Sequence, residues 1–398
     1  MHEIPLIVSA DDHVVEPPDL WNGRVPQQFA DRAPRVERRK LRFVGGTRGR
    51  EWTEDPNAPW CDAWHYDGAV IPLSRLVAAV GLDDIDVDVT TYDELHPGTY
   101  NQKARLSDMD TNHIEAALQF PNVFRFAGQT FSEHPDKTLA LACIRAYNDW
   151  IIDEWGAGDG QGRLLPVTII PLWDPQLAQA ELQRCNNKGS FMVSFPENPY
   201  PLGFPSFYTN HWDPFFSACA ESNTIINMHI GSSSRTAHAT PEAPYIVTST
   251  QTFVNSQGSL LDLIFSGTLQ RHPNLKLSYA ESQIGWLPYI LERADKLWAE
   301  RDNNDFGSNL PIPPTQYIPE RVYFCMYDDE VGLRNRDLIG IDQITFETDY
   351  PHADTTFPNT KNVFTQICNQ AGLSTQERYK LARGNIIRGY NLDRYGLT

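Results

Sequence analysis

Short apolar, β-branched runs recur eight times along the chain, and helical patterns separate most of them. Several runs, such as residues 167–170, are continuous enough to suit strands buried on both faces of a parallel sheet. The predicted strands are 6–13, 113–121, 164–171, 190–196, 224–231, 275–282, 322–328 and 343–349. Eight strands alternating with helices over 398 residues predict an α/β fold, the (β/α)8 or TIM barrel. A doubly wound open sheet is the alternative, but no GxGxxG follows the first strand.

Amphipathic segments supply the helices of this pattern. Clear examples are residues 139–154, 175–186, 259–271 and 286–300. The last one, 375–392, is expected to pack on the outside of the barrel. No repeat or low-complexity tract divides the chain, so residues 1–398 are predicted to form a single domain.

Residues 17–101 do not fit the alternation, and they are rich in Pro, Trp, Asp and Arg. Connections between a strand and a helix are usually a few residues long, so this segment is an insertion. Because it follows the carboxyl end of a strand, we expect a cap or lid over the catalytic face. Within it, the turn 45–50 is either a phosphate cradle or, more simply, an exposed hairpin turn. Its aromatic residues Trp60, Trp64 and Tyr66 line a substrate pocket or form the cap's own small core.

The formal net charge of −18 disfavours nucleic acid as a partner. No run of about 18 apolar residues predicts a membrane span. The first residues lack the basic and apolar stretches of a signal peptide, which predicts a cytoplasmic location. The six cysteines are scattered without a CxxC pair, so they do not suggest a zinc finger or an iron–sulfur site.

Metal-ligand residues stand where three of the predicted strands end. Asp11 and His13 close the first strand, and residues two apart on a strand share a face. His229 ends the fifth strand and Asp349 the eighth. Barrel enzymes keep their chemistry at this end of the strands, and a carboxylate buried there is costly unless it is paired or bound to metal. The coincidence predicts a metal centre, with Glu16 close enough along the chain to reach it.

These motifs resemble the amidohydrolase superfamily, in the branch that contains metal-dependent decarboxylases and hydrolases. The acid-x-His of the first strand matches Asp11 and His13, and His229 and Asp349 match the His of strand five and the Asp of strand eight. Segments 105–110 and 271–276 also resemble this branch, and the likeness runs from residue 6 to about residue 392. The motif set is specific for the family and not for the reaction.

One position departs from the family. The resemblance implies a His at the end of the sixth strand, where this chain has Glu281. Glu281 adds a fourth carboxylate to Asp11, Glu16 and Asp349, and crowded like charges force proton uptake unless cations neutralise them. The set therefore favours two divalent ions, with iron, manganese or zinc suited to mixed carboxylate and imidazole ligands. Alternatively, Glu281 pairs with an arginine such as Arg235 or Arg293.

This pattern is similar to an offshoot of the family, the TIM-barrel nonheme diiron oxygenases. That resemblance implies two irons, dioxygen as co-substrate, and hydroxylation of a small organic substrate, in many cases linked to coenzyme A. The alternative is a hydrolase or decarboxylase with one zinc or manganese, in which Glu281 does the acid–base work of the missing His. A barrel that only binds or scaffolds is disfavoured, because it would have no reason to keep six metal-suited groups.

Three further residues complete the candidate site. His352, three residues beyond Asp349, is a candidate ligand or acid–base group, or it orients a ligand. Glu197 follows the fourth strand and is a candidate substrate-binding residue. Arg235, beyond His229, is a candidate clamp for a phosphate or carboxylate. The sequence does not fix the oligomeric state, although barrel enzymes of this kind often form homodimers.

Overall fold

All eight predicted strands are present as parallel strands in the computed structural model, which describes residues 4–44, 52–81, 88–234, 240, 243–300 and 309–398. One sheet has the order β1-β6-β7 and the other the order β12-β11-β10-β9-β8. The parallel strands are β1 (Ile7–Val14), β6 (Ile114–Pro121), β7 (Leu164–Pro166), β8 (Met192–Pro196), β9 (Ile225–His229), β10 (Lys276–Ala280), β11 (Val322–Met326) and β12 (Ile344–Phe346). Most are shorter than predicted. Each begins at the first residue of its predicted range or within two residues after it.

Hydrogen bonds join the two sheets at both seams. Between β7 and β8, Thr168 and Val193 form a parallel bridge. Between β12 and β1, the Asp349 amide donates to the Asp11 carbonyl at 3.0 Å, and the His13 amide donates to the Tyr350 carbonyl at 2.6 Å. The predicted TIM barrel is confirmed, and three candidate ligands, Asp11, His13 and Asp349, lie on its second seam.

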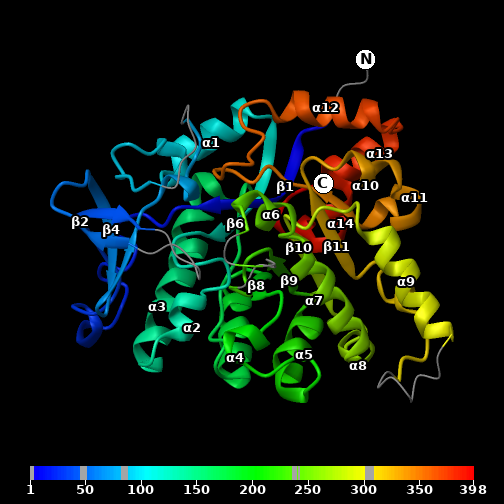
Figure 1. The fold of residues 1–398 in the computed structure, drawn as a ribbon, viewed down its shortest axis with the longest axis horizontal. Coiled ribbons are helices and arrows are strands. Elements are labelled where there is room, and N and C mark those ends of the chain that lie inside the picture. The colour runs from blue at the N-terminus through cyan, green and yellow to red at the C-terminus, as the bar shows by residue number, and fades with distance from the viewer. Residues whose placement is uncertain (1–3, 45–51, 82–87, 235–239, 241–242, 301–308) are drawn as a thin grey trace.

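Helices surround the strands (Figure 1). Their bounds are α1 (Gln102–Thr111), α2 (Gln129–Glu133), α3 (Lys137–Trp150), α4 (Pro175–Asn187), α5 (Asp213–Ser222), α6 (Tyr245–Thr250), α7 (Val254–Phe265), α8 (Thr268–Arg271), α9 (Leu287–Glu300), α10 (Glu330–Arg334), α11 (Arg336–Ile339), α12 (Thr360–Gln370), α13 (Thr375–Tyr379) and α14 (Asn385–Tyr390). The predicted helix 259–271 is divided, because Gly267 takes a left-handed φ of 75°. None of the helices in the described part of the chain has the length and hydropathy needed to span a bilayer.

The carboxyl-terminal segment does not pack on the outside of the barrel as expected. Ile386 and Tyr390 of α14 belong to the same buried cluster as inward-facing strand residues such as Val8 and Leu118. Lys276, at the start of β10, donates to the Gly389 carbonyl at 2.9 Å. The segment therefore lies across the amino-terminal end of the barrel, which leaves the carboxyl-terminal end for the candidate site.

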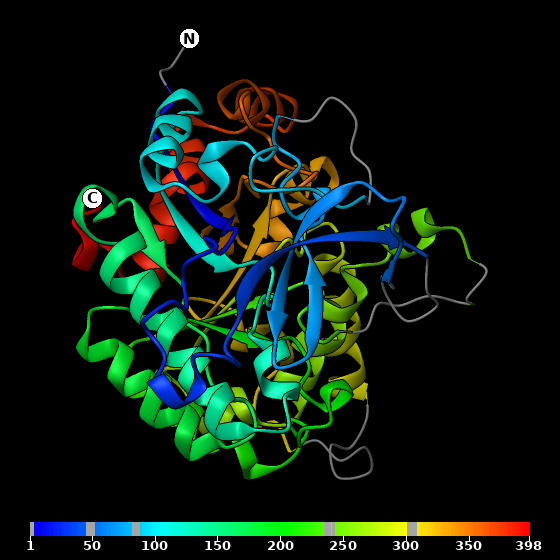
Figure 2. The same ribbon diagram turned by 90° about the vertical axis from the view of Figure 1, so that its left-hand side faces the viewer.

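The insertion contains a four-stranded antiparallel sheet of order β3-β2-β4-β5. Its strands are β2 (Arg35–Phe43), β3 (Trp52–Glu54), β4 (Trp60–Tyr66) and β5 (Ala69–Pro72). Figure 2 shows this sheet, in blue, in front of the barrel strands. The Ala79 amide donates to the Pro351 carbonyl at 2.8 Å, just beyond β12.

The insertion's aromatic residues mostly serve a core. Trp64 and Tyr66 are buried, and both rings pack edge-on against Phe124. Trp60 is 56% exposed, with the Lys40 ammonium over its ring. The turn 45–50 lies outside the described residues.

Candidate metal centre

A β-bulge in β1 sets the direction of its two ligand candidates. Pairing with β6 shifts register between Ile7 and Val8, and it shifts again between Ser9 and Asp12, where β1 has one residue too many. The extra residue reverses the inward and outward alternation. Val8 faces the barrel interior before the bulge, and Asp11 and His13 face the carboxyl-terminal mouth after it. The predicted shared face of Asp11 and His13 is therefore present, and the bulge turns it inward.

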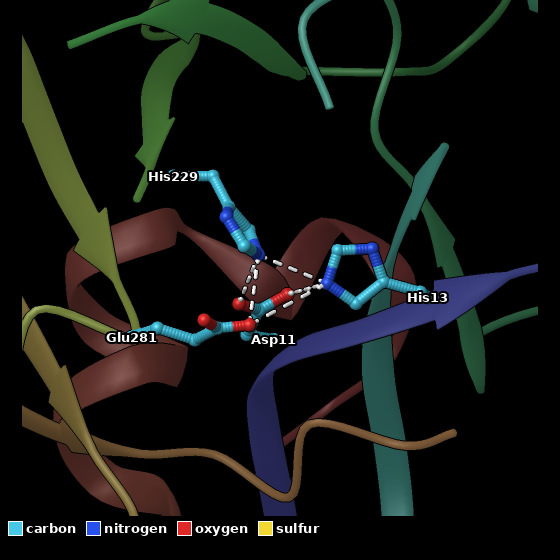
Figure 3. Close-up of side chains that lie close together, drawn as sticks. All are labelled: Asp11, His13, His229 and Glu281. Carbon is cyan, nitrogen blue, oxygen red and sulfur yellow. Dashed lines mark hydrogen bonds and ion pairs between the residues drawn. The ribbon is translucent and has the colours of Figure 1, made fainter. Parts of the chain in front are cut away.

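Side chains from three strands converge at the mouth (Figure 3). Atoms of Asp11, His13, His229 and Glu281 lie within 4.8 Å of one another. His229 Nε2 is 3.1 Å from Asp11 Oδ2 and 3.1 Å from Glu281 Oε1. His13 Nε2 is 3.4 Å from Asp11 Oδ1. Such separations suit donor atoms that share one cation at about 2.0 to 2.2 Å.

A second, overlapping group extends the cluster. It consists of His13, Glu281, Asp349 and His352. Asp349 Oδ1 lies 3.7 Å from His13 Nε2 and 2.7 Å from His352 Nδ1. The Glu281 side chain is 13% exposed, and its Oε1 lies 4.0 Å from His13 Nε2 and 3.6 Å from His352 Nδ1. Among the described residues, these ion-pair neighbours of Glu281 are histidines. We call the six side chains of both groups the donor cluster.

The two buried imidazoles face each other through the same nitrogen. His13 Nδ1 donates to the Pro121 carbonyl, and His229 Nδ1 donates to the Ile230 carbonyl. Carbonyls only accept, so these bonds place the proton of each neutral ring on Nδ1 and leave a lone pair on Nε2. The two Nε2 atoms are 2.9 Å apart. Two lone pairs at that distance require a proton or a cation between them.

Buried carboxylate oxygens add to this requirement. Neither side-chain oxygen of Asp11 accepts a well-aligned hydrogen bond from a residue that the structure describes, and the same holds for Asp349 Oδ1, although imidazole nitrogens lie close to them. These oxygens lie close to the imidazole nitrogens without forming aligned hydrogen bonds to them, as expected of atoms arranged around one shared cation position. Unpaired buried carboxylate oxygens are costly, and a cation removes that cost. The residues present therefore fit a divalent metal ion.

The pKa shifts follow from the same crowding. Burial raises the pKa of Asp11 and Asp349 above the usual range. Burial alone would lower the pKa of His229, but the charges of Glu281 and Asp11 outweigh it and raise that pKa well above its usual value. Without metal, a proton on His229 supplies the positive charge that the cluster needs.

We expect cation binding to displace that proton. Below the raised pKa of His229 a cation must compete with the proton on Nε2, so affinity should increase as pH rises from 6 towards 8. The expected gain is up to about tenfold per pH unit for each proton released. Calorimetry with Mn²⁺ in two buffers of different ionisation enthalpy measures both affinity and proton release. A pH-independent affinity without proton release would contradict this account.

Two predicted site residues, Glu16 and Glu197, lie outside the donor cluster. Glu16 is not brought into the donor cluster, because both its oxygens accept backbone amides, from Asn122 at 3.1 Å and Val123 at 2.9 Å. Glu197 is buried beside the cluster, where it accepts the Ser256 hydroxyl at 2.6 Å and has a pKa raised by burial to about 8. Arg235 lies outside the described residues. Glu16 is therefore not one of the carboxylates that surround the candidate metal position.

Two residues at the centre were not predicted. Glu347 is buried, and its Oε2 accepts the Glu281 amide at 3.0 Å. Side chains alternate along a strand, and Ile344 and Phe346 of β12 pack outward, in the core between strands and helices. The alternation does not by itself mark Glu347 as a site residue, but it accounts for the direction of the Glu347 side chain. The centroid of the Phe126 ring lies 4.0 Å from that of the His229 ring, so an aromatic face packs against this ligand candidate.

Comparisons with known proteins agree with this geometry. A family model described as amidohydrolase matches residues 84–392. A gamma-resorcylate decarboxylase of Rhizobium sp. is 25% identical over 315 residues, which cover 73% of this chain and 88% of that relative.

Solved structures give the same fold. A 2,6-dihydroxybenzoate decarboxylase from Rhizobium has a TM-score of 0.60 and 18% identity over 98% of this chain and 100% of its own. A dihydroxybenzoic acid decarboxylase from Polaromonas sp., with bound manganese and the inhibitor 2-nitroresorcinol, has a TM-score of 0.62 and 17% identity over 98% of each chain.

These findings overturn the favoured oxygenase hypothesis. The curated relatives at 24–25% identity are decarboxylases, so the prediction of a diiron monooxygenase is wrong. Two irons, dioxygen and a coenzyme A thioester lose their support with it. The argument for a second ion counted Glu281 together with Asp11, Glu16 and Asp349, and in the structure Glu16 accepts backbone amides instead.

Proposed function

Because the chain belongs to the amidohydrolase family, we propose that it is a metal-dependent decarboxylase of a small aromatic acid. The observation that carries the metal is the pair of Nε2 atoms of His13 and His229, 2.9 Å apart with their lone pairs facing. Relatives that are gamma-resorcylate decarboxylases support the reaction, and the manganese of the Polaromonas enzyme supports the metal. We propose one manganese ion per chain.

Four residues would hold this ion. We assign Asp11, His13, His229 and Asp349 as ligands, because the described residues offer their unpaired oxygens and facing nitrogens no other partner of suitable geometry. A bound divalent ion would act as a Lewis acid on the oxygens of a hydroxybenzoate. The carboxylates of Asp11 and Asp349 would neutralise it within a buried site.

The chain's own residues manage the proton. Decarboxylation breaks the bond between the ring carbon and the carboxyl carbon, carbon dioxide leaves, and the ring carbon takes a proton. Burial alone would lower the pKa of His352, but the charge of Asp349 raises it to about 10, so this imidazole holds a proton. Glu281 Oε1 lies 3.6 Å from His352 Nδ1 and would pass that proton to the ring carbon. Phe126 offers a flat apolar surface beside His229 for the aromatic ring.

The direct test is a decarboxylation assay. Protein stripped of metal and reloaded with Mn²⁺ is incubated with benzoates that carry a hydroxyl beside the carboxylate, and carbon dioxide and the phenol are measured. We expect one phenol per carbon dioxide, no oxygen consumption, and inhibition by 2-nitroresorcinol. Turnover that consumes oxygen, or none with any such acid, would refute the proposal.

We further propose that residues 17–101 form the outer wall of the substrate pocket. The insertion is tied to the mouth by Val77, whose carbonyl accepts the Asn122 side chain at 2.8 Å, and by Tyr92, whose hydroxyl donates to the Glu16 carbonyl at 2.6 Å. We expect 2-nitroresorcinol to slow hydrogen exchange in the insertion, including β4 and β5. Unchanged exchange there, with the inhibitor bound, would mean that the insertion does not close over the pocket.

A further inference from the structure

Helix α1 carries two buried contacts that reach behind the donor cluster. The helix starts after Asn101, whose side chain accepts the Ala104 amide. Arg105 and Asp108, one turn apart, point toward the seam between β1 and the segment after β12. We call these two residues the α1 brace. They belong to the family-like segment 105–110, to which the proposed reaction gives no role.

Arg105 is fully buried, and its guanidinium donates hydrogen bonds to backbone carbonyls and to a side-chain amide oxygen. Nη2 donates to the carbonyl of His13 at 2.5 Å, and Nε donates to the carbonyl of Gly98 at 2.8 Å. Nη1 donates to Gln119 Oε1 at 2.9 Å. The nearest carboxylate recorded for it, Asp12, is 4.0 Å away. A buried ion pair is weak evidence for a gain in stability, and this one is long. The positions of the three oxygens that Arg105 holds therefore explain the residue better than its charge does.

The brace also fixes the residue that follows Asp349. The guanidinium carbon lies 4.1 Å from the centre of the Tyr350 ring. The Tyr350 hydroxyl donates to Asp108 Oδ2 at 2.6 Å. The Tyr350 carbonyl in turn accepts the His13 amide. One helix turn thus holds the backbone of His13 from one side and the neighbour of Asp349 from the other.

We propose that the α1 brace is a positioning device that keeps the ends of β1 and β12 in the register at which His13 and Asp349 meet one metal ion. The inference rests on the proposed function, because it assumes a metal at the donor cluster. Arg105 acts through the His13 carbonyl and does not touch the ion or the substrate. Lysine cannot replace it, because three diverging acceptors need the planar fork of a guanidinium.

The test compares manganese affinity with the stability of the metal-free protein. Arg105→Lys should weaken Mn²⁺ binding by about 10- to 100-fold, as the loss of partners that orient metal ligands commonly does. Tyr350→Phe keeps the ring under the guanidinium and removes only the bond to Asp108, so a loss of about three- to tenfold is expected. Equilibrium dialysis gives the affinity, and urea unfolding of the metal-free form gives the stability.

Arg321 provides a matched control. Its Nη2 also donates to two carbonyls, of Leu269 at 2.7 Å and His272 at 2.8 Å, but it precedes β11 at the opposite end of the barrel. Arg321→Lys should lower stability and leave Mn²⁺ affinity within twofold of the wild type. The same result for a folded Arg105→Lys would overturn the proposal and leave Arg105 a purely structural role.

Two further outcomes are distinct. If Arg105→Lys does not fold, Tyr350→Phe decides, and an affinity within twofold of the wild type then rejects the brace. If the wild-type protein itself does not bind Mn²⁺, the proposed function fails first and this inference fails with it.

Discussion

Replacing His229 with Ala should abolish decarboxylation, by about 1000-fold or more, while the barrel stays folded. The substitution removes one of the two facing Nε2 atoms and the partner of Asp11 and Glu281. A loss of about 4 kcal/mol of transition-state stabilisation corresponds to such a factor. Metal analysis after dialysis should show the manganese content falling from one per chain towards zero.

Thermal unfolding gives this prediction a second readout. At a metal concentration about 100 times the dissociation constant, binding stabilises the native wild-type protein by about 2.7 kcal/mol. The His229→Ala protein should show no such stabilisation. A folded variant that keeps its metal and its activity would remove His229 from the site.

The control for this experiment is another buried histidine paired with a carboxylate. His272 is 7% exposed, and its Nε2 lies 3.1 Å from Asp213 Oδ1, away from the donor cluster. His272→Ala should lower stability, because it leaves a cavity and removes one partner of Asp213, which keeps Arg271 at 3.1 Å. It should not change metal content or decarboxylation per folded molecule.

The fold could be predicted from the sequence because alternation is a local property. Apolar runs such as 225–228 identify buried strands by themselves, and residues at their carboxyl ends must meet once the barrel forms. That reasoning placed Asp11, His13, His229 and Asp349 together from three separate places in the chain, and the two overlapping groups of the donor cluster include all four. The extent of the insertion, residues 17–101, is a prediction of the same kind, since 85 residues cannot form an ordinary connection.

What the sequence did not reveal depends on backbone conformation. The bulge in β1 has no sequence signature, yet it decides which way Asp11 faces. Glu16 was placed by its distance along the chain, although three residues are enough for it to turn onto the amides of Asn122 and Val123. The last helical segment was placed outside the barrel because an amphipathic pattern does not state which apolar surface it covers.

Glu281 presents the sharpest choice, because its carboxylate lies where it can act either as a ligand or as a proton carrier. Its Oε1 is 3.1 Å from His229 Nε2 and 3.6 Å from His352 Nδ1. Its backbone has a φ of 54°, a left-handed conformation that costs about 1 to 2 kcal/mol and is held in place by the bond from its amide to Glu347. Such strain at the mouth of a barrel commonly accompanies function.

Glu281→Gln should separate the two roles. Glutamine keeps the size and can still offer an oxygen, but it cannot carry a proton. We expect one manganese per chain to remain and decarboxylation to fall by about 100- to 10,000-fold, the usual range for loss of a general acid or base. Glu197→Gln is the matched control, a buried acid bonded to Ser256, and it should reduce turnover much less. If metal content falls together with activity in Glu281→Gln, then Glu281 is a ligand.

Glu281→His completes this test, since it restores the group that the family resemblance implies at this position. Histidine tolerates a left-handed backbone better than most residues, so the φ of 54° does not exclude it. An imidazole here can also hold a proton, so turnover should recover to between the levels of Glu281→Gln and the wild type, with one manganese still bound. The pH profile should shift, because an imidazole titrates in a different range from a carboxylate. Recovery without any shift in that profile would mean that residue 281 does not handle the proton, and the assignment would pass to His352 with Asp349, whose Oδ1 lies 2.7 Å from the His352 ring.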